Sequence, residues 1–277
     1  MRGKVRIGAV SYLNARPLVY GMQQGLGAER VDLDFDVPSG LAARMAAGEL
    51  DVALLPIVEL ACIPDLELVS GLGIATRGPA RSVLLISRQP LERLQRVALD
   101  PESRTSNALA RILCAEVWGV RPEFRTVGRS LEAALATCDA AVRIGDKALF
   151  ESPPADFRVH DLGQVWTDAR GLPFVFAAWI ARRGVADRRL REILRESYVA
   201  GSRAIETIAR DYEWNGRRDP ELARRYLAEH IRFELGEAEL QGIRAFFHAA
   251  RALELIEAVP RVEPAPPEPA RLAGLRP

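Results

Sequence analysis

The stretch Ala43-Arg-Met-Ala-Ala-Gly-Glu-Leu-Asp-Val-Ala-Leu-Leu-Pro-Ile57 decides the fold class. Its first part reads as a helix that stops at Gly48, and its apolar run Asp51–Leu55 is then ended by a proline. A short continuous apolar run is typical of a strand that is buried on both faces of a parallel sheet. Upstream, Val5–Val10 and Val31–Val37 have strand patterns, and helical stretches separate all three runs. We therefore expect βαβ units and a parallel sheet.

The same pattern returns in Glu132-Ala-Ala-Leu-Ala-Thr-Cys-Asp-Ala-Ala-Val-Arg-Ile-Gly-Asp146, with a helix, an aspartate that opens a strand, and a sharp break. Strands at 97–100 and 124–127 are expected beside it. Two apolar segments, 81–87 and 172–180, flank this middle part and look like strands that cross between lobes. The chain is therefore predicted to be an α/β protein of two lobes, arranged as a clamshell with an interlobe cleft.

These crossover segments set the expected lobe boundaries. The first lobe would comprise residues 1–87 and 177–259, including C-terminal helices, and the second lobe residues 88–176. Residues 260–277 contain six prolines and few large apolar side chains. A segment of this composition cannot bury enough surface to offset its ordering entropy, so we expect a flexible tail.

Composition and charge exclude several classes of function. Lys and Arg number 38 against 37 Asp and Glu, a formal net charge of +1, which gives no electrostatic footprint for nucleic acid or a membrane. No apolar run approaches the length of a spanning helix or of a signal peptide, so a cytoplasmic location is expected. His160, His230 and His248 are scattered, and phosphate-binding or nucleophile-elbow motifs are missing. No metal and no cofactor is therefore expected.

In open α/β sheets ligands bind at the carboxyl ends of strands, so the loop after Val10 should line the cleft. This loop reads Ser11-Tyr-Leu-Asn-Ala-Arg-Pro17, and proline suits the first turn of a helix. Ser11 or Asn14 could simply cap that helix, or the helix start could bind an anion. Both interpretations stay open.

Two further loops carry polar side chains to the same edge. Asp100-Pro-Glu-Ser-Arg-Thr-Ser-Asn107 places more hydroxyl and amide groups at one helix start than capping needs, and a carboxylate or phosphate ligand would explain the excess. Gly145-Asp146 ends the next strand, where the aspartate could act as a base, bind a hydroxyl or cap a helix. These loops predict a protein that binds a small anion between its lobes.

The chain resembles the chorismate dehydratases of the futalosine route to menaquinone. The matching segments span residues 5 to about 182 and are Ser11-Tyr-Leu-Asn-Ala-Arg-Pro-Leu18, Asp51-Val-Ala-Leu-Leu-Pro56, Leu99-Asp-Pro-Glu-Ser-Arg-Thr-Ser106, Ile144-Gly-Asp146, Asp161-Leu-Gly163 with Trp166, and Gly171-Leu-Pro-Phe-Val-Phe-Ala-Ala-Trp179. One departure is Arg170, where that family has threonine, so different loop contacts are expected there.

This resemblance implies the fold of the type 2 periplasmic binding proteins and a cofactor-free carbon–oxygen lyase (hydro-lyase). The implied reaction removes water from chorismate to give 3-[(1-carboxyvinyl)oxy]benzoate, the first step of futalosine-pathway menaquinone biosynthesis. The implied partner is this small dicarboxylate, with no nucleic acid and no membrane.

The resemblance also implies site residues by position. The implied catalytic residues are Asn14, to assist proton removal or orient the ring, Ser82, to hydrogen-bond the substrate, and Asp146, to accept or donate a proton. The implied substrate-binding residues are Ser11, Tyr12, Arg16, Pro56, Ser103, Arg104, Thr105, Ser106, Asn107 and Gly145.

Two other functions remain as alternatives. One is a 1,4-dihydroxy-6-naphthoate synthase-type enzyme of the same pathway, which shares the fold but lacks the Ser-Tyr-Leu-Asn opening. The other is a non-catalytic protein that binds a small anion. Turnover of chorismate distinguishes the three.

Overall fold

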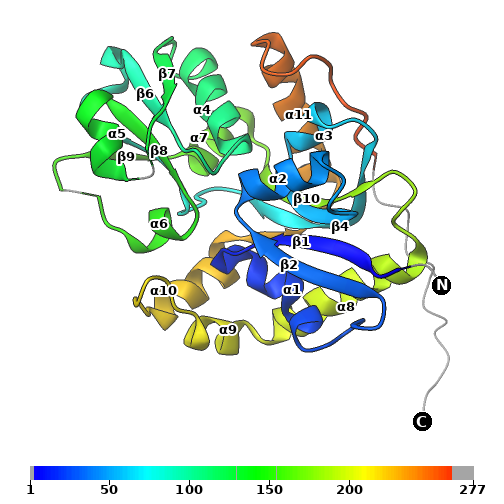
Figure 1. Cartoon of the computed structure of the whole chain (residues 1–277). Helices are drawn as coiled ribbons and strands as arrows, with labels where there is room; N and C mark the ends of the chain where they lie inside the picture. The colour runs from blue at the N-terminus through cyan, green and yellow to red at the C-terminus, as the bar shows by residue number, and fades with distance from the viewer. Residues whose placement is uncertain (1–2, 129, 154, 264–277) are drawn as a thin grey trace.

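A computed structural model describes residues 3–128, 130–153 and 155–263, and it divides into two α/β lobes (Figure 1). The first lobe holds a six-stranded sheet of order β11-β4-β10-β3-β1-β2, and the second a five-stranded sheet of order β7-β6-β8-β5-β9. The predicted two-lobed α/β architecture is confirmed. Within the described ranges, no helix combines the length and apolar character needed to cross a membrane.

The first sheet has a parallel and an antiparallel part. Its strands are β1 (Val5–Val10), β2 (Val31–Asp36), β3 (Val52–Pro56), β4 (Leu66–Thr76), β10 (Phe174–Arg182) and β11 (Arg232–Glu234). β1 is parallel to β2 and β3, whereas β10 is antiparallel to β3 and β4. β1 and β3 therefore end at the same edge of the sheet, as the apolar runs predicted.

Helices cover both faces of this sheet. They are η1 (Leu13–Ala15), α1 (Arg16–Gln23), α2 (Pro38–Ala46), α3 (Glu59–Cys62), α8 (Arg188–Arg203), α9 (Ile205–Asp211), α10 (Pro220–Arg225), the π-helical turn η3 (Tyr226–His230) and α11 (Glu237–Ala252). In Figure 1, α1 and α8 lie below the sheet, and α2, α3 and α11 lie above it. The α11 helix also packs against α4 of the second lobe.

The second lobe repeats the plan of the first. Its elements are β5 (Val83–Ser87), η2 (Leu91–Arg93), β6 (Arg96–Leu99), α4 (Thr105–Glu116), β7 (Glu123–Thr126), α5 (Leu131–Thr137), β8 (Ala140–Ile144), α6 (Gly145–Phe150), β9 (Arg158–Asp161) and α7 (Leu162–Arg170). β3 lies between parallel β1 and antiparallel β10, and β8 lies between parallel β6 and antiparallel β5. The two strands of the repeated sequence pattern therefore occupy equivalent positions.

The chain passes from the first sheet to the second before residue 87, the lobe boundary that we predicted. β5, which we expected in the first lobe, pairs with β8 and β9 of the second sheet. The chain returns to the first sheet at Phe174, which pairs with Thr76, three residues before the expected 177. An apolar crossover strand fits either sheet, so its composition cannot assign it. Of the predicted tail 260–277, residues 264–277 lie outside the described residues.

Two aromatic residues of the 171–179 segment, Phe174 and Trp179, belong to the core. Phe174 packs edge to face against Trp166 and Phe246, with ring centroids 5.2 and 5.4 Å apart. The Trp166 indole N–H donates to the Pro173 carbonyl at 3.2 Å. Arg170, the departure from the family pattern, lies over the Trp166 ring and pairs with Glu116 of α4. This segment therefore joins the central strand β10 to the helices around it.

Candidate functional site

A cavity lies between the lobes at the ends of β1, β3 and β8. It encloses about 540 Å³ of empty space, including its opening to solvent. Its walls are formed by Val10, Tyr12, Asn14, Pro38, Pro56, Ile74, Ser82, Val83, Ser103, Thr105, Ser106, Ile144, Gly145, Phe176, Ala177 and Ile231. Both lobes contribute, as expected for an interlobe cleft.

The structure divides the predicted site residues into two groups. Those that line the cavity are Tyr12, Asn14, Pro56, Ser82, Ser103, Thr105, Ser106 and Gly145. The others surround it without being among its lining residues: Ser11, Arg16, Arg104, Asn107 and Asp146.

Asn14 and Ser82 are joined by a tyrosine that the sequence analysis missed. The Asn14 side-chain N–H donates to the Tyr226 hydroxyl at 3.0 Å, and that hydroxyl lies 2.7 Å from Ser82 Oγ. Asn14 Oδ1 is buried without a hydrogen-bond partner. Neither Ser11 nor Asn14 caps α1, whose start has no side-chain cap. The amide is instead part of the cavity wall.

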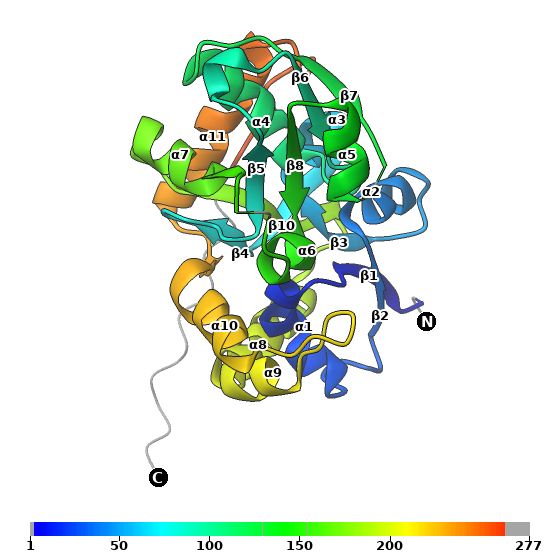
Figure 2. The same cartoon turned by 90° about the vertical axis from the view of Figure 1, so that its left-hand side faces the viewer.

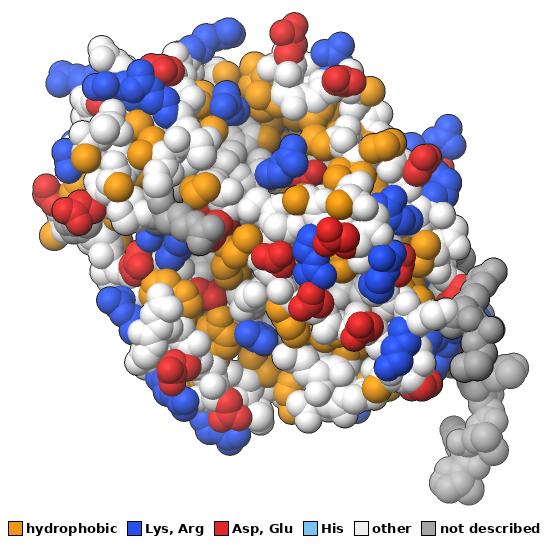
Figure 3. Space-filling model, in the orientation of Figure 1, with side chains coloured by type: hydrophobic (Ala, Val, Ile, Leu, Met, Phe, Trp, Pro, Cys, Tyr) orange, Lys and Arg blue, Asp and Glu red, His pale blue; other side chains and the backbone are white. Residues whose placement is uncertain are grey.

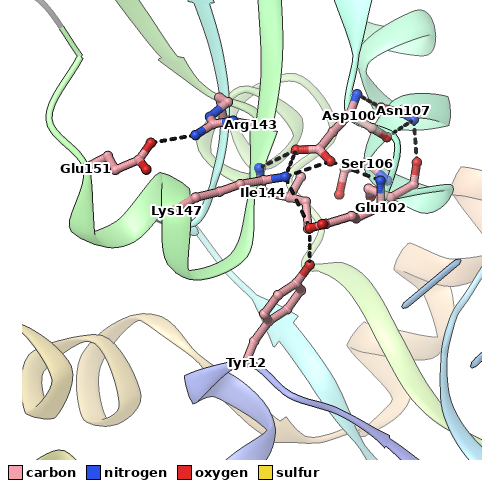
Figure 4. Close-up of polar contacts among 10 residues, drawn as sticks. Tyr12, Asp100, Glu102, Ser106, Asn107, Arg143, Ile144, Lys147 and Glu151 are labelled. Atoms are coloured by element: carbon pink, nitrogen blue, oxygen red, sulfur yellow. Dashed lines mark hydrogen bonds and ion pairs between the residues drawn. The ribbon is translucent and has the colours of Figure 1, made fainter. Parts of the chain in front are cut away.

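Tyr12 lines one side of the cavity. Its hydroxyl is held by the network of charged groups drawn in Figure 4. Its hydroxyl donates to Glu102 Oε2 at 2.8 Å, and Lys147 Nζ lies 3.2 Å from the same oxygen. Lys147 also pairs with Asp100 at 2.9 Å, and the Ile144 N–H donates to Asp100 at 3.3 Å. Burial, reinforced by Glu102, raises the pKa of Tyr12. A residue of the first lobe is thus held by charged groups of the second.

The start of α4 presents hydroxyl groups to the cavity. Ser103 Oγ accepts from the Ser106 N–H at 3.2 Å and so caps the first turn. Thr105 Oγ1 accepts from the Val58 N–H at 3.2 Å, which ties α4 to the loop after β3. A hydroxyl that accepts one bond can still donate its own proton to a ligand. Together with the helix dipole, this arrangement suits an oxyanion.

Asn107 and Arg104 are engaged outside the cavity lining. The Asn107 amide accepts from the Asp100 N–H at 3.1 Å and donates to the carbonyls of Asp100, at 2.9 Å, and Ser103. Arg104 is half exposed, and its Nε lies 3.0 Å from a carboxylate oxygen of the fully buried Glu59. Burial raises the pKa of Glu59, and Arg104 opposes that rise. The Asn107 side chain thus holds the backbone of the loop between β6 and α4 in place and is not directed to the cavity.

Asp146 links the two lobes. Its Oδ1 accepts from the Leu13 N–H at 3.1 Å, and its Oδ2 accepts from the Tyr212 hydroxyl. Burial raises the pKa of Asp146 to about 6, although the bonds from Tyr212 and Leu13 act in the opposite direction. Arg16 lies over the Tyr212 ring at 5.7 Å and donates to the Ser11 carbonyl at 3.2 Å. Tyr212 is a second residue that the sequence analysis missed.

The polar groups that line the cavity are neutral hydroxyls and one amide among the residues the structure describes. No cluster of His, Cys, Asp and Glu suited to a metal ion occurs in the described part of the chain. On the face seen in Figure 3, charges of both signs are interspersed without a large area of one sign. The site can thus hold a small, partly apolar ligand and hydrogen-bond its oxygens.

Solved structures show the same fold. A protein of Archaeoglobus fulgidus superposes with a TM-score of 0.71 at 16% identity, over 91% of this chain and 98% of that one. The periplasmic aliphatic sulphonate binding protein of Escherichia coli gives a TM-score of 0.63 at 16% identity, over 100% and 97% of the two chains. The predicted periplasmic-binding-protein-like clamshell is therefore confirmed.

Sequence comparisons show the family. A chorismate dehydratase of Thermus thermophilus is 30% identical over 264 residues, which cover 88% of this chain and 94% of that protein. A chorismate dehydratase of Campylobacter jejuni is 28% identical over 253 residues, covering 90% and 98%. The family model described as menaquinone biosynthesis matches residues 5–252. The resemblance seen in the sequence is thus confirmed, and the chain belongs to the menaquinone-biosynthesis family.

Proposed function

We propose that this protein is a chorismate dehydratase, a cofactor-free hydro-lyase that converts chorismate into 3-[(1-carboxyvinyl)oxy]benzoate. The observation that carries the proposal is the alignment with two chorismate dehydratases over most of each chain. The cavity supports it, because its neutral hydrogen-bonding groups and apolar side chains suit a small oxygen-rich ring compound.

The chemistry asks little of the protein beyond placement and proton movement. Chorismate loses the hydrogen on ring C3 as a proton and the hydroxyl on C4, and these leave together as water. The electron pair of the C3–H bond completes the aromatic ring, so the driving force lies within the substrate. The enzyme gains rate by holding one reactive conformer and by positioning proton donors and acceptors.

The walls of the cavity offer matching contacts. The hydroxyls of Ser103, Thr105 and Ser106 at the start of α4 would hold a carboxylate. Apolar side chains, among them Ile74 and Phe176, would contact the ring. Asn14 and Ser82 would then contact the oxygens near the reacting carbons. Asp146 is not among the lining residues, but its pKa near 6 suits proton transfer at neutral pH, so it is the candidate proton donor or acceptor.

Incubation of the purified protein with chorismate tests the proposal. We expect a product lighter by one water, with the ultraviolet spectrum of a benzoate and a rate that EDTA does not change. Binding of chorismate without turnover would instead establish a non-catalytic anion-binding protein. Absence of binding would direct the search to later intermediates of the pathway, as for the naphthoate synthase alternative.

The Asn14→Ala variant tests the site itself. We expect its kcat to fall by about 100-fold or more, the usual effect of removing one well-placed polar group from an active site. Steady-state kinetics with chorismate measure the effect, and circular dichroism checks the fold. Near-full turnover by this variant would remove Asn14 from the catalytic machinery.

A further inference from the structure

Tyr226 contacts two polar residues of the cavity wall, Asn14 and Ser82, through its hydroxyl. It is the first residue of the π-helical turn η3, and its side chain is only 1% exposed. Its hydroxyl is within hydrogen-bond distance of Asn14 and Ser82, which line the cavity, whereas Tyr226 is not among the lining residues. π-helical turns are rare and occur frequently at functional sites.

The hydrogen bonds have a single consistent direction. The Asn14 amide N–H can only donate, so the Tyr226 oxygen accepts from it at 3.0 Å. The phenol proton is then directed to Ser82 Oγ, 2.7 Å away. Ser82 in turn donates to the Ala80 carbonyl, which can only accept, at 3.4 Å. This last bond is long, so a substrate oxygen could replace it at little cost.

The consequence is a fixed pair of groups at the wall. With its N–H engaged by Tyr226, Asn14 keeps its Oδ1 as a buried acceptor without a partner. Because Ser82 Oγ accepts the proton of the Tyr226 hydroxyl, the Ser82 hydroxyl presents its own proton as a hydrogen-bond donor. Without the Tyr226 hydroxyl, the Asn14 amide and the Ser82 hydroxyl could both rotate. Neither side chain would then present a fixed donor or acceptor to the cavity.

Tyr226 is suited to this task because it stays neutral. Burial raises its pKa, and the nearby Asp146 raises it further. The phenol therefore keeps its proton at physiological pH and is a hydrogen-bonding group, not a base.

Building on the proposed function, we propose that Tyr226 is a positioning residue of the dehydratase: its hydroxyl orients Asn14 as the acceptor and Ser82 as the donor that meet the substrate. The role is a geometric one, because the phenol reaches the substrate only through these two side chains.

The Tyr226→Phe variant removes the hydroxyl and keeps the ring. Loss of positioning should lower kcat by about 10- to 100-fold and leave KM within about threefold, because misplaced groups affect the transition state most. The matched control is Tyr198→Phe, which removes a half-buried phenol on α8 outside the cavity lining. Its kcat and KM should equal those of the wild type.

A double-variant comparison separates positioning from a merely structural role. Since Tyr226 acts partly through Ser82, Tyr226→Phe should slow Ser82→Ala by a clearly smaller factor than it slows the wild type. Equal factors in both backgrounds, or an unchanged kcat with a lowered Tm, would overturn the inference. Should Tyr226→Phe fail to fold, 3-fluorotyrosine at position 226 keeps the shape and makes the phenol a stronger donor. A kcat unaffected by that change would also overturn it.

The wild-type assay separates this inference from the proposed function. A wild type that does not convert chorismate overturns the dehydratase assignment and this role with it. An active wild type with an equally active Tyr226→Phe overturns only the positioning role.

Discussion

Asp146 combines two properties that affect stability and catalysis in different ways. Its carboxylate accepts hydrogen bonds from Leu13 and Tyr212, both outside its own lobe, and it is almost fully buried. Loss of solvent outweighs these bonds and raises its pKa from the ordinary 3.8 to about 6. The folded protein therefore holds this proton more tightly than the unfolded chain does.

This shift predicts a pH dependence of stability. The contribution of Asp146 is fully present below about pH 4 and is lost as the pH rises through 6, because the unfolded chain releases the proton first. Relative to Asp146→Asn, the free energy of unfolding of the wild type should fall by about 2 kcal/mol between pH 4 and pH 7, at about 1.4 kcal/mol per pKa unit. Urea titrations at each pH measure the difference, and a constant difference would contradict the raised pKa.

The same variant tests the predicted proton transfer. If Asp146 carries a proton during the reaction, the wild-type kcat should change with an apparent pKa near 6. That inflection should be missing in Asp146→Asn, which cannot titrate. A parallel pH profile in both proteins would leave Asp146 only its contacts between the lobes.

At the level of single residues, the sequence predicted residues that line the cavity but not the tyrosines that hydrogen-bond to the site residues. Asn14 belongs to the Ser-Tyr-Leu-Asn motif, Ser82 was implied by its position in the family resemblance, and both line the cavity. Tyr212 and Tyr226 lie in the helical C-terminal third, which carries no comparable motif, and only folding brings them to the site. An excess of polar residues at a helix start also cannot separate ligand contacts from loop contacts such as those of Asn107.

At the level of elements, strands with a clear apolar pattern were predicted to within one or two residues, whereas β4, β9 and β11 were missed. β4 (Leu66–Thr76) contains two glycines, which weaken any strand signal. The structure explains Gly73, because a Cβ there would lie 2.5 Å from the Ala177 carbonyl oxygen of β10. The glycine permits close pairing beside a bulge, and that requirement arises only from the neighbouring strand.

A close helix contact gives a prediction at this scale. α8 packs on α1 so tightly that a Cβ at Gly201 would lie 2.0 Å from the Pro17 carbonyl oxygen. Gly201→Ala should therefore force the helices apart and destabilise the fold by about 1–3 kcal/mol, as overpacking does. Thermal and urea unfolding measure the change. Gly128→Ala adds the same methyl group where nothing lies within 4 Å, and it should unfold like the wild type. Equal stability of Gly201→Ala and the wild type would contradict the packing.

At the level of the whole molecule, the cavity exists because the lobes meet. Figure 2 shows α6 of the second lobe directly above the start of α1 in the first. The Leu13 N–H bond to Asp146 and the Tyr12 bond to Glu102 cross this junction. The ring of Tyr12 also lies against Gly145, so close that a Cβ there would be 2.9 Å from Tyr12 Cε2. The Tyr12 ring and the backbone of Gly145 are thus in close contact across the junction of the lobes.

The Gly145→Ala variant should therefore open the lobes. Gly145 has a φ of 68°, so alanine adds both left-handed strain and an overlap with the Tyr12 ring. Gly119, with a φ of 65° and nothing within 4 Å of its Cβ position, isolates the first effect. Gly119→Ala should lose about 1–2 kcal/mol of stability and keep its KM. Gly145→Ala should in addition raise KM for chorismate about tenfold and increase the radius of gyration measured by X-ray scattering. Equal KM values in the two variants would mean that Tyr12 yields to the methyl group, and that closure is set by the hydrogen bonds of Tyr12 and Asp146 instead.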